Sequence, residues 1–139
     1  MTYTQLAYWH LATIIPAFGI GARQLLKRKG TLIHKRLERI YMILMLATAL
    51  ITLAMPAQVG PQFLHHFGFI HVFSLLALIS VPTAYFAARR RDLSAHRASM
   101  IALYIGGLLI AGAFAFAPGR MLHGWLFGWL SNWSGLRVP

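Results

Sequence analysis

The sequence predicts an all-α membrane protein: a four-transmembrane-helix bundle made of two parallel helical-hairpin repeats, followed by a C-terminal amphipathic helix. Three observations predict this class. Of the 139 residues, 58% are hydrophobic and 11% are charged, whereas an ordinary soluble domain has roughly 25% charged residues. The basic residues cluster between apolar segments, and landmark residues recur at a nearly constant spacing. This composition argues against a water-soluble enzyme and against a disordered chain.

Four apolar segments are candidates for membrane-spanning helices, which need about 20 mostly apolar residues. They cover residues 3–22, 40–56, 62–88 and 98–119, and none of them contains Lys, Arg, Asp or Glu. The second segment is short and can extend back toward Ile33. The four segments nearly fill residues 1–119, so we expect one transmembrane bundle there and no separate soluble domain.

The basic residues predict the orientation of the bundle. Eleven of the thirteen Lys and Arg residues lie between the first two segments or between the last two. The positive-inside rule makes both regions cytoplasmic and places both termini outside. We therefore expect a multi-pass protein of the bacterial inner (cytoplasmic) membrane. Its net charge of +11 suits anionic lipid at the cytoplasmic face, and nucleic acid is not an expected partner.

Two stretches of the chain repeat the same landmarks, the first at about residues 5–56 and the second at about residues 63–118. His34 and His96, each within a basic stretch, are 62 residues apart, and His10 and His71 are 61 residues apart. Each repeat has two spans, so both repeats have the same orientation and a pseudo-twofold axis along the membrane normal relates them. His10 and His71 then lie at one depth, roughly 25 Å from the basic regions at 1.5 Å per residue.

The paired histidines predict a haem site at each membrane face. Two imidazoles that face each other in an apolar four-helix bundle suit the iron of haem b. We expect His10 and His71 to bind one haem, and His34 and His96 to bind a second if two are present. Basic residues near the second pair would neutralise the propionates; they are Lys35, Arg36, Arg91 and Arg97. The absence of Cys excludes thiolate sites and covalent haem attachment through CxxCH.

The other histidines and the helix starts leave alternatives open. His34 and His96 could instead be interfacial residues that bind lipid phosphate or are merely solvated, beside helices that begin at the N-caps Thr31 and Asp92 or Ser94. A possible site for a quinol or another electron donor involves His65 and His66 at the outer end of the third span. No catalytic residue is predicted, because the two acids, Glu38 and Asp92, both lie in the basic regions.

Residues 120–139 form a Trp-rich tail, which we expect to lie on the outer membrane interface as an amphipathic helix. Trp125, Trp129 and Trp133 are spaced by four residues, so one helical face carries all three. The tail anchors the protein in the interface or, alternatively, docks a partner or covers a site.

Several of these landmarks resemble a family of predicted bacterial membrane proteins, the domain of unknown function 2306 (DUF2306). The landmarks are His10, His71, the stretch Lys29-Gly30 followed by His34-Lys35, and the stretch Asp92-Leu93-Ser94-Ala95-His96-Arg97-Ala98-Ser99-Met100. The arrangement also resembles the haem-binding four-helix core of cytochrome b561-type proteins. In that core, alternating helices hold two b haems, which matches His10 with His71 and His34 with His96. The resemblance implies electron transfer across the membrane from a quinol-like or ascorbate-like donor.

The predicted function is therefore that of a small b-type cytochrome-like membrane protein that moves electrons between a small donor and an acceptor. Whether it is an enzyme stays open. One alternative is a non-enzymatic accessory subunit of a larger respiratory or photosynthetic membrane complex. The chain could also assemble as a homo-oligomer. A second alternative is a small transporter or lipid-binding protein that uses the basic regions.

Overall fold

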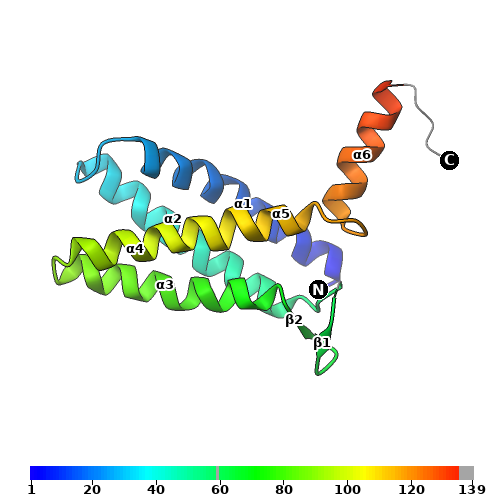
Figure 1. Cartoon of the computed structure of the whole chain (residues 1–139), viewed down its shortest axis with the longest axis horizontal. Helices are drawn as coiled ribbons and strands as arrows, with labels where there is room; N and C mark the ends of the chain where they lie inside the picture. Colours follow the sequence, from blue (N-terminus) through cyan, green and yellow to red (C-terminus); the bar gives the residue numbers. More distant parts are fainter. Residues whose placement is uncertain (59, 135–139) are drawn as a thin grey trace.

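The computed structural model describes residues 1–58 and 60–134, and these fold into an antiparallel helical bundle (Figure 1). The first hairpin consists of α1 (Tyr3–Leu26) and α2 (Leu32–Ala54). The second consists of α3 (His71–Arg89) and a return segment made of α4 (Leu93–Tyr104), the π-helix η1 (Ile105–Ile110) and α5 (Ala111–Ala115). The connections α1–α2 and α3–α4 lie at the same end (Figure 1), which we call the basic end.

Three helical segments in the described part of the chain are long and apolar enough to cross a membrane: Leu32–Ala54, His71–Arg89 and Leu93–Ala115. The protein is therefore a multi-pass membrane protein by helix length and composition. α1 has 24 residues but is not among these three. The fourth span and the repeat symmetry remain predictions.

The helices at the basic end begin at the predicted N-caps. The Thr31 hydroxyl accepts a hydrogen bond from the backbone N–H of His34 at 3.1 Å. The Asp92 carboxylate accepts one from Ala95 at 3.0 Å. Each side chain satisfies a backbone donor that the first helical turn leaves unpaired. The two caps fix where α2 and α4 start, and so fix the positions of His34 and His96.

The prediction that the third span starts at residue 62 is wrong. β1 (Gln62–Phe63) and β2 (Phe67–Gly68) form a short antiparallel hairpin there, with Phe63 opposite Phe67. The turn between them contains Leu64 and His65, which have φ values of 55° and 57°. Positive φ is incompatible with a right-handed helix, so the helix begins only at His71. We call this end of the bundle the hairpin end.

The core lies between the four helical segments, and its buried residues come from α1, α2, α3 and the return segment. Tyr41, Met45 and Leu103 are its largest fully buried side chains. α1 approaches closely at Gly21, where an added Cβ would lie 2.5 Å from the Tyr104 ring and 2.9 Å from the Tyr41 ring. The outward face of the bundle is rich in exposed aliphatic side chains, for example Ile15, Ile43 and Ile79. Such a surface suits contact with lipid rather than water.

The predicted tail helix is observed as α6 (Met121–Ser134), which projects away from the bundle (Figure 1). Its three Trp side chains are exposed, and the rings of Trp129 and Trp133 stack with centroids 6.3 Å apart. The last five residues of the predicted tail, 135–139, lie outside the described residues. The position of α6 on a membrane interface remains a prediction.

Candidate functional site

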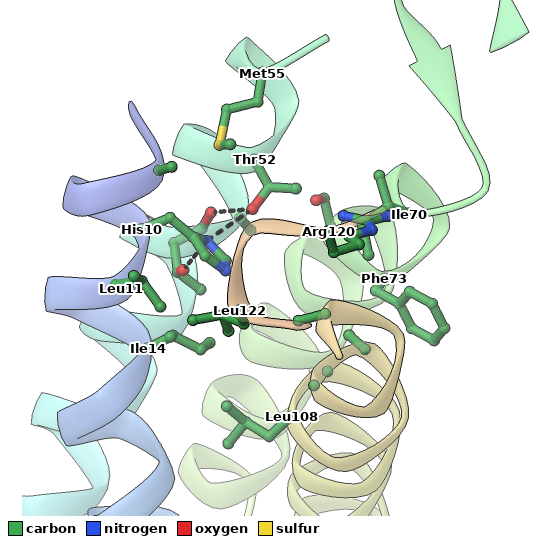
Figure 2. Close-up of a pocket in the computed structure, with 18 of the residues that line it drawn as sticks. His10, Leu11, Ile14, Thr52, Met55, Ile70, Phe73, Leu108, Arg120 and Leu122 are labelled. Carbon is green, nitrogen blue, oxygen red and sulfur yellow. Dashed lines mark hydrogen bonds between the residues drawn. The ribbon is translucent and has the colours of Figure 1, made fainter. Parts of the chain in front are cut away.

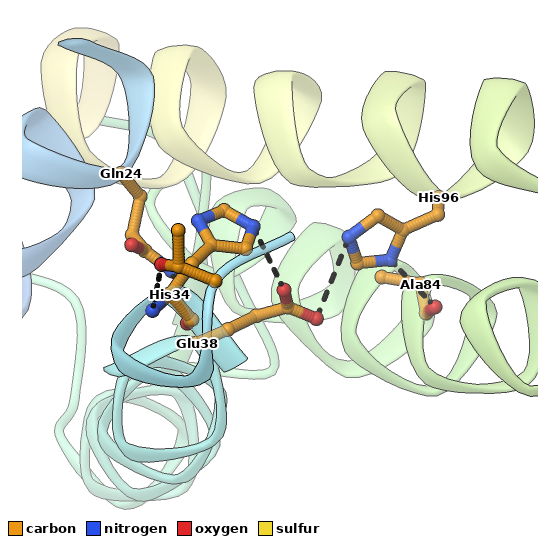
Figure 3. Close-up of polar contacts among 6 residues, drawn as sticks. Gln24, His34, Glu38, Ala84 and His96 are labelled. Atoms are coloured by element: carbon orange, nitrogen blue, oxygen red, sulfur yellow. Dashed lines mark hydrogen bonds and ion pairs between the residues drawn. The ribbon is translucent and has the colours of Figure 1, made fainter. Parts of the chain in front are cut away.

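The basic end brings two of the predicted histidines to one carboxylate (Figure 3). His34 and Glu38 are one turn apart on α2, with His34 Nε2 at 3.3 Å from one carboxylate oxygen. His96 reaches the other oxygen from α4, with its Nε2 at 3.4 Å. The three side chains are only 12–15% exposed. The bundle therefore joins the equivalent histidines of the two predicted repeats through a single acid.

The ring of His96 is oriented by a neighbouring helix. Its Nδ1–H donates a hydrogen bond to the carbonyl oxygen of Ala84 on α3 at 2.9 Å, and a carbonyl can only accept. In a neutral imidazole, Nε2 would then turn a lone pair toward the Glu38 carboxylate. The contact is attractive only when the two groups hold a proton between them, as imidazolium with carboxylate or as imidazole with carboxylic acid.

His34 is fixed through its backbone, while part of its ring is left without a partner. Gln24 on α1 donates a hydrogen bond from its side chain to the His34 carbonyl at 2.9 Å. His34 Nδ1 is buried and has no hydrogen-bond partner among the described residues. The same is true of Gln24 Oε1 and of the hydroxyl of Tyr41. Buried polar atoms are normally paired, so three such atoms on residues that line the same cavity point to a site that receives a polar group.

These orphaned atoms belong to residues that line a cavity of about 1010 Å³ at the basic end. Six basic side chains also line the cavity: Lys29, Lys35, Arg39, Arg89, Arg91 and Arg97. Glu38 is the single acidic side chain among its lining residues. Of the predicted propionate partners, Lys35, Arg91 and Arg97 line the cavity, whereas Arg36 does not. This arrangement is suited to binding a molecule that carries negative charge.

At the hairpin end, His10 turns its ring away from α1 and toward a second cavity (Figure 2). Its Nδ1 lies 2.8 Å from the hydroxyl of Thr48 and 3.1 Å from that of Thr52, both on α2. Thr52 donates its hydroxyl hydrogen to the Thr48 carbonyl at 2.8 Å, so it can only accept from His10. Nδ1 therefore carries the hydrogen, and a neutral His10 presents the lone pair of Nε2 to the cavity.

His71 is placed differently from His10. It is 4% exposed, and its Nδ1 accepts a hydrogen bond from Gly68 N–H at 2.9 Å. Its Nε2 lies 3.1 Å from the carbonyl oxygen of Met55 and donates to it. His71 thus ties the β-hairpin to the end of α2 and does not line the cavity that His10 faces. The structure brings the predicted inner pair together, but not the outer pair.

The second cavity has a volume of about 580 Å³ and mainly apolar walls. Its polar lining includes His10, Thr48, Ser74 and Arg120. Residues of η1, among them Leu108, form part of the wall, and π-helical turns often occur at functional sites. The cavity is therefore a candidate site for a largely apolar molecule with one polar group.

The predicted donor-site residues lie outside both cavities. His66 contacts the carbonyl oxygen of Leu53 through Nε2 at 2.9 Å, and its ring lies 5.7 Å from that of His71. His65 is exposed in the hairpin turn. His66 therefore supports the packing of the hairpin, and the structure gives no geometry that favours a donor site at either residue.

Three contributors were missed by reasoning from the sequence alone. Glu38 was set aside as a residue of a basic region, although its spacing of four from His34 places both on one helical face. The pair Thr48 and Thr52 has the same spacing on α2, and it holds His10. Arg120 stood out only as a basic residue outside the two basic clusters. For Glu38 and for the two threonines, the decisive partner comes from another helix, His96 on α4 and His10 on α1, and the sequence does not show which helices meet.

Among the residues that the structure describes, no group of three or more His, Asp or Glu side chains is placed to hold a metal ion. Haem would need fewer protein ligands than a bare metal ion, because the porphyrin itself binds the iron. The inner pair has the donor set for this group, with two imidazoles and several cations. The Glu38 carboxylate contacts both Nε2 atoms, so it would have to move for His34 and His96 to hold an iron between them.

Comparison with known proteins gives the family but not the activity. The model of a family described as predicted membrane protein (DUF2306) matches residues 7–125. The chain belongs to this family, and the match extends over all four long helical segments. No curated protein and no solved structure matches the chain.

Proposed function

We propose that the protein is a small b-type cytochrome-like membrane protein that transfers electrons, with haem b held at the basic end between His34 and His96. One observation carries the proposal. Side chains 62 residues apart direct their Nε2 atoms to the same carboxylate, at 3.3 and 3.4 Å, inside a cavity lined by six basic residues. A quinol-like or other small molecule is the proposed electron donor.

Each part of this site has a distinct role in the proposal. The haem supplies the one-electron redox centre. The hydrogen bond from His96 Nδ1 to Ala84 fixes the ring and leaves Nε2 as the ligating atom, which is the usual arrangement around a metal-bound histidine. Lys35, Arg91 and Arg97 neutralise the propionates. A buried wall that includes Tyr41 and Tyr104 limits the access of water to the site.

The geometry favours one haem over two. His10 has a suitable orientation, because its Nδ1 is held by hydroxyl groups and its Nε2 faces a cavity. His71, however, uses both ring nitrogens on backbone groups. Ligation by His71 would break these bonds and loosen the hairpin, so the proposal assigns the haem to the inner pair.

The experiment is a reduced-minus-oxidised absorbance spectrum of the purified protein, with a pyridine-haemochrome count of haem per chain. We expect sharp bands of bis-histidine haem b and one haem per chain. His34→Ala and His96→Ala should each lose the haem, whereas His65→Ala, at an exposed residue outside both cavities, should retain it. A colourless wild-type protein after expression with ample haem would contradict the proposal. So would a full haem content in both His34→Ala and His96→Ala.

A second candidate function, that of an accessory subunit in a larger membrane complex, is favoured by α6. This helix projects from the bundle, and Trp125, Trp129 and Trp133 are 52%, 61% and 81% exposed. Aromatic side chains presented in this way are typical of interface anchors. Mild detergent extraction followed by native mass determination separates the two functions: a large assembly that dissociates when the three Trp are replaced by Ser supports the accessory role.

A further inference from the structure

The hairpin-end cavity has a basic side chain, Arg120, and no acidic side chain among the described residues that line it. Arg120 lines this cavity, and its Nε is buried without a hydrogen-bond partner among the described residues. The chain has two acidic side chains, Glu38 and Asp92. Glu38 is engaged with two histidines at the basic end, and Asp92 caps α4 at that same end. No acidic side chain is therefore available to Arg120, and a partly buried guanidinium calls for an anion.

His10 faces the same cavity from the other side. Figure 2 shows His10 and Arg120 on opposite walls, with apolar side chains such as Leu11 and Leu108 along the space between α1 and the return segment. Because Nδ1 carries the hydrogen, Nε2 of a neutral His10 accepts a hydrogen bond from whatever occupies the cavity. A fitting ligand thus offers an O–H to His10 and an anionic or strongly accepting oxygen to Arg120.

We propose that this cavity binds a long-chain carboxylic acid, with the carboxyl group between Arg120 and His10 and the hydrocarbon chain along Leu11, Ile14 and Leu108. The hydroxyl of the acid donates to Nε2, and its proton either stays on oxygen or passes to Nε2, which gives an imidazolium beside the carboxylate. The second oxygen accepts from the guanidinium. The proposal is independent of the haem proposed at the other end.

Other membrane-soluble ligands match the two groups less well. The phosphodiester group of a phospholipid has no O–H at neutral pH to donate to Nε2, although its charge suits Arg120. A long-chain alcohol or a quinol can donate to His10, but it leaves the charge of Arg120 uncompensated. A carboxylic acid satisfies both groups, because it enters with a proton that it can share with His10 Nε2 while its second oxygen accepts from the Arg120 guanidinium.

The test uses the full-length protein in detergent with palmitic acid and its alcohol, hexadecanol, as probes. Binding is measured by titration calorimetry, and the ¹³C shift of labelled carboxyl carbon reports the environment of the head group. We expect palmitic acid to bind at least tenfold more tightly than hexadecanol. Arg120→Gln should abolish this difference, Arg120→Lys should retain part of it, and Arg28→Gln should leave it unchanged, since Arg28 is exposed and lines neither cavity.

Three results overturn the proposal: equal binding of acid and alcohol to the unaltered protein, equal effects of Arg120→Gln and Arg28→Gln, or tight binding of a quinol or a phospholipid with none of the acid. The comparison of acid with alcohol needs no variant, so it decides the matter even if Arg120→Gln does not fold. Haem content does not enter any of these measurements, so loss of the cytochrome proposal leaves this one intact.

Discussion

The two ends of the bundle contain histidine pairs with nearly the same sequence spacing, yet they use them differently. At the basic end, His34 and His96 both contact the Glu38 side chain. At the hairpin end, His10 contacts two hydroxyl groups and faces a cavity. His71 instead uses both ring nitrogens on backbone groups, one of Gly68 in the hairpin and one of Met55 at the end of α2. Equal spacing along the chain therefore does not mean equal chemistry.

The difference arises from what connects the helices at each end. The connections at the basic end are short, and Thr31 and Asp92 cap the helices that follow them. Both histidines therefore lie in the first turns of helices, and their Nε2 atoms reach the Glu38 carboxylate. At the hairpin end, the connection from α2 to α3 contains β1 and β2, whose backbone groups need partners. His71, the first residue of α3, pairs with one of them, the N–H of Gly68, and also with the carbonyl of Met55 at the end of α2. The His71 side chain therefore binds the connection, whereas a symmetric bundle would leave it facing the interior opposite His10.

The largest expected effect follows from that structural role of His71. His71→Ala leaves the N–H of Gly68 and the carbonyl of Met55 without these partners in a partly buried place, which should cost about 3 kcal/mol of unfolding free energy. His10→Ala is the matched variant, and it should cost about 1 kcal/mol, because Thr52 keeps its bond to the Thr48 carbonyl. Unfolding in mixed detergent, followed by tryptophan fluorescence, measures both. Equal losses would mean that the two histidines have the same role and that the contrast between the ends is wrong.

A smaller effect tests the packing at the basic end. An added methyl group at Gly21 would press on the rings of Tyr41 and Tyr104, so Gly21→Ala should destabilise the protein by about 2 kcal/mol. Gly19 on the same helix has nothing within 4 Å of an added Cβ, and Gly19→Ala should be neutral or stabilising by up to about 1 kcal/mol. Thermal unfolding by circular dichroism compares the two variants. A loss of similar size at both positions would show that backbone entropy, not close approach, sets the effect.

The sequence predicted much of the scaffold, because scaffold features depend on local signals. Apolar length gave the helices, and the capping residues Thr31 and Asp92 placed two helix starts. The hairpin was missed, since the apolar run from Gln62 continues into α3 and hydropathy does not report the positive φ of Leu64 and His65.

The candidate site was predicted only in part, because its contacts run between helices. His34 and His96 contact the same carboxylate, whereas their role as haem ligands stays a prediction. That Glu38 lies between them, and that Thr48 and Thr52 set the tautomer of His10, depends on helix rotation. A sequence fixes which residues share a face of one helix, but not which face of the next helix they meet.

The smallest expected effect concerns the partner of His96 Nε2 at the basic end, with His10 at the hairpin end as the comparison. Glu38→Gln keeps the shape of the side chain, and its amide N–H can donate to the lone pair of a neutral His96 Nε2. We therefore expect a stability loss of only about 1 kcal/mol, together with a change in the partner of His96 Nε2 from a carboxylate oxygen to an amide N–H. Nitrogen-15 shifts of labelled histidine report this change, and His10 serves as the internal control, since its partners are hydroxyl groups that the substitution does not touch. If His96 keeps its wild-type shifts in Glu38→Gln, the carboxylate does not set the hydrogen bonding of Nε2, and the basic end resembles the hairpin end in its chemistry after all.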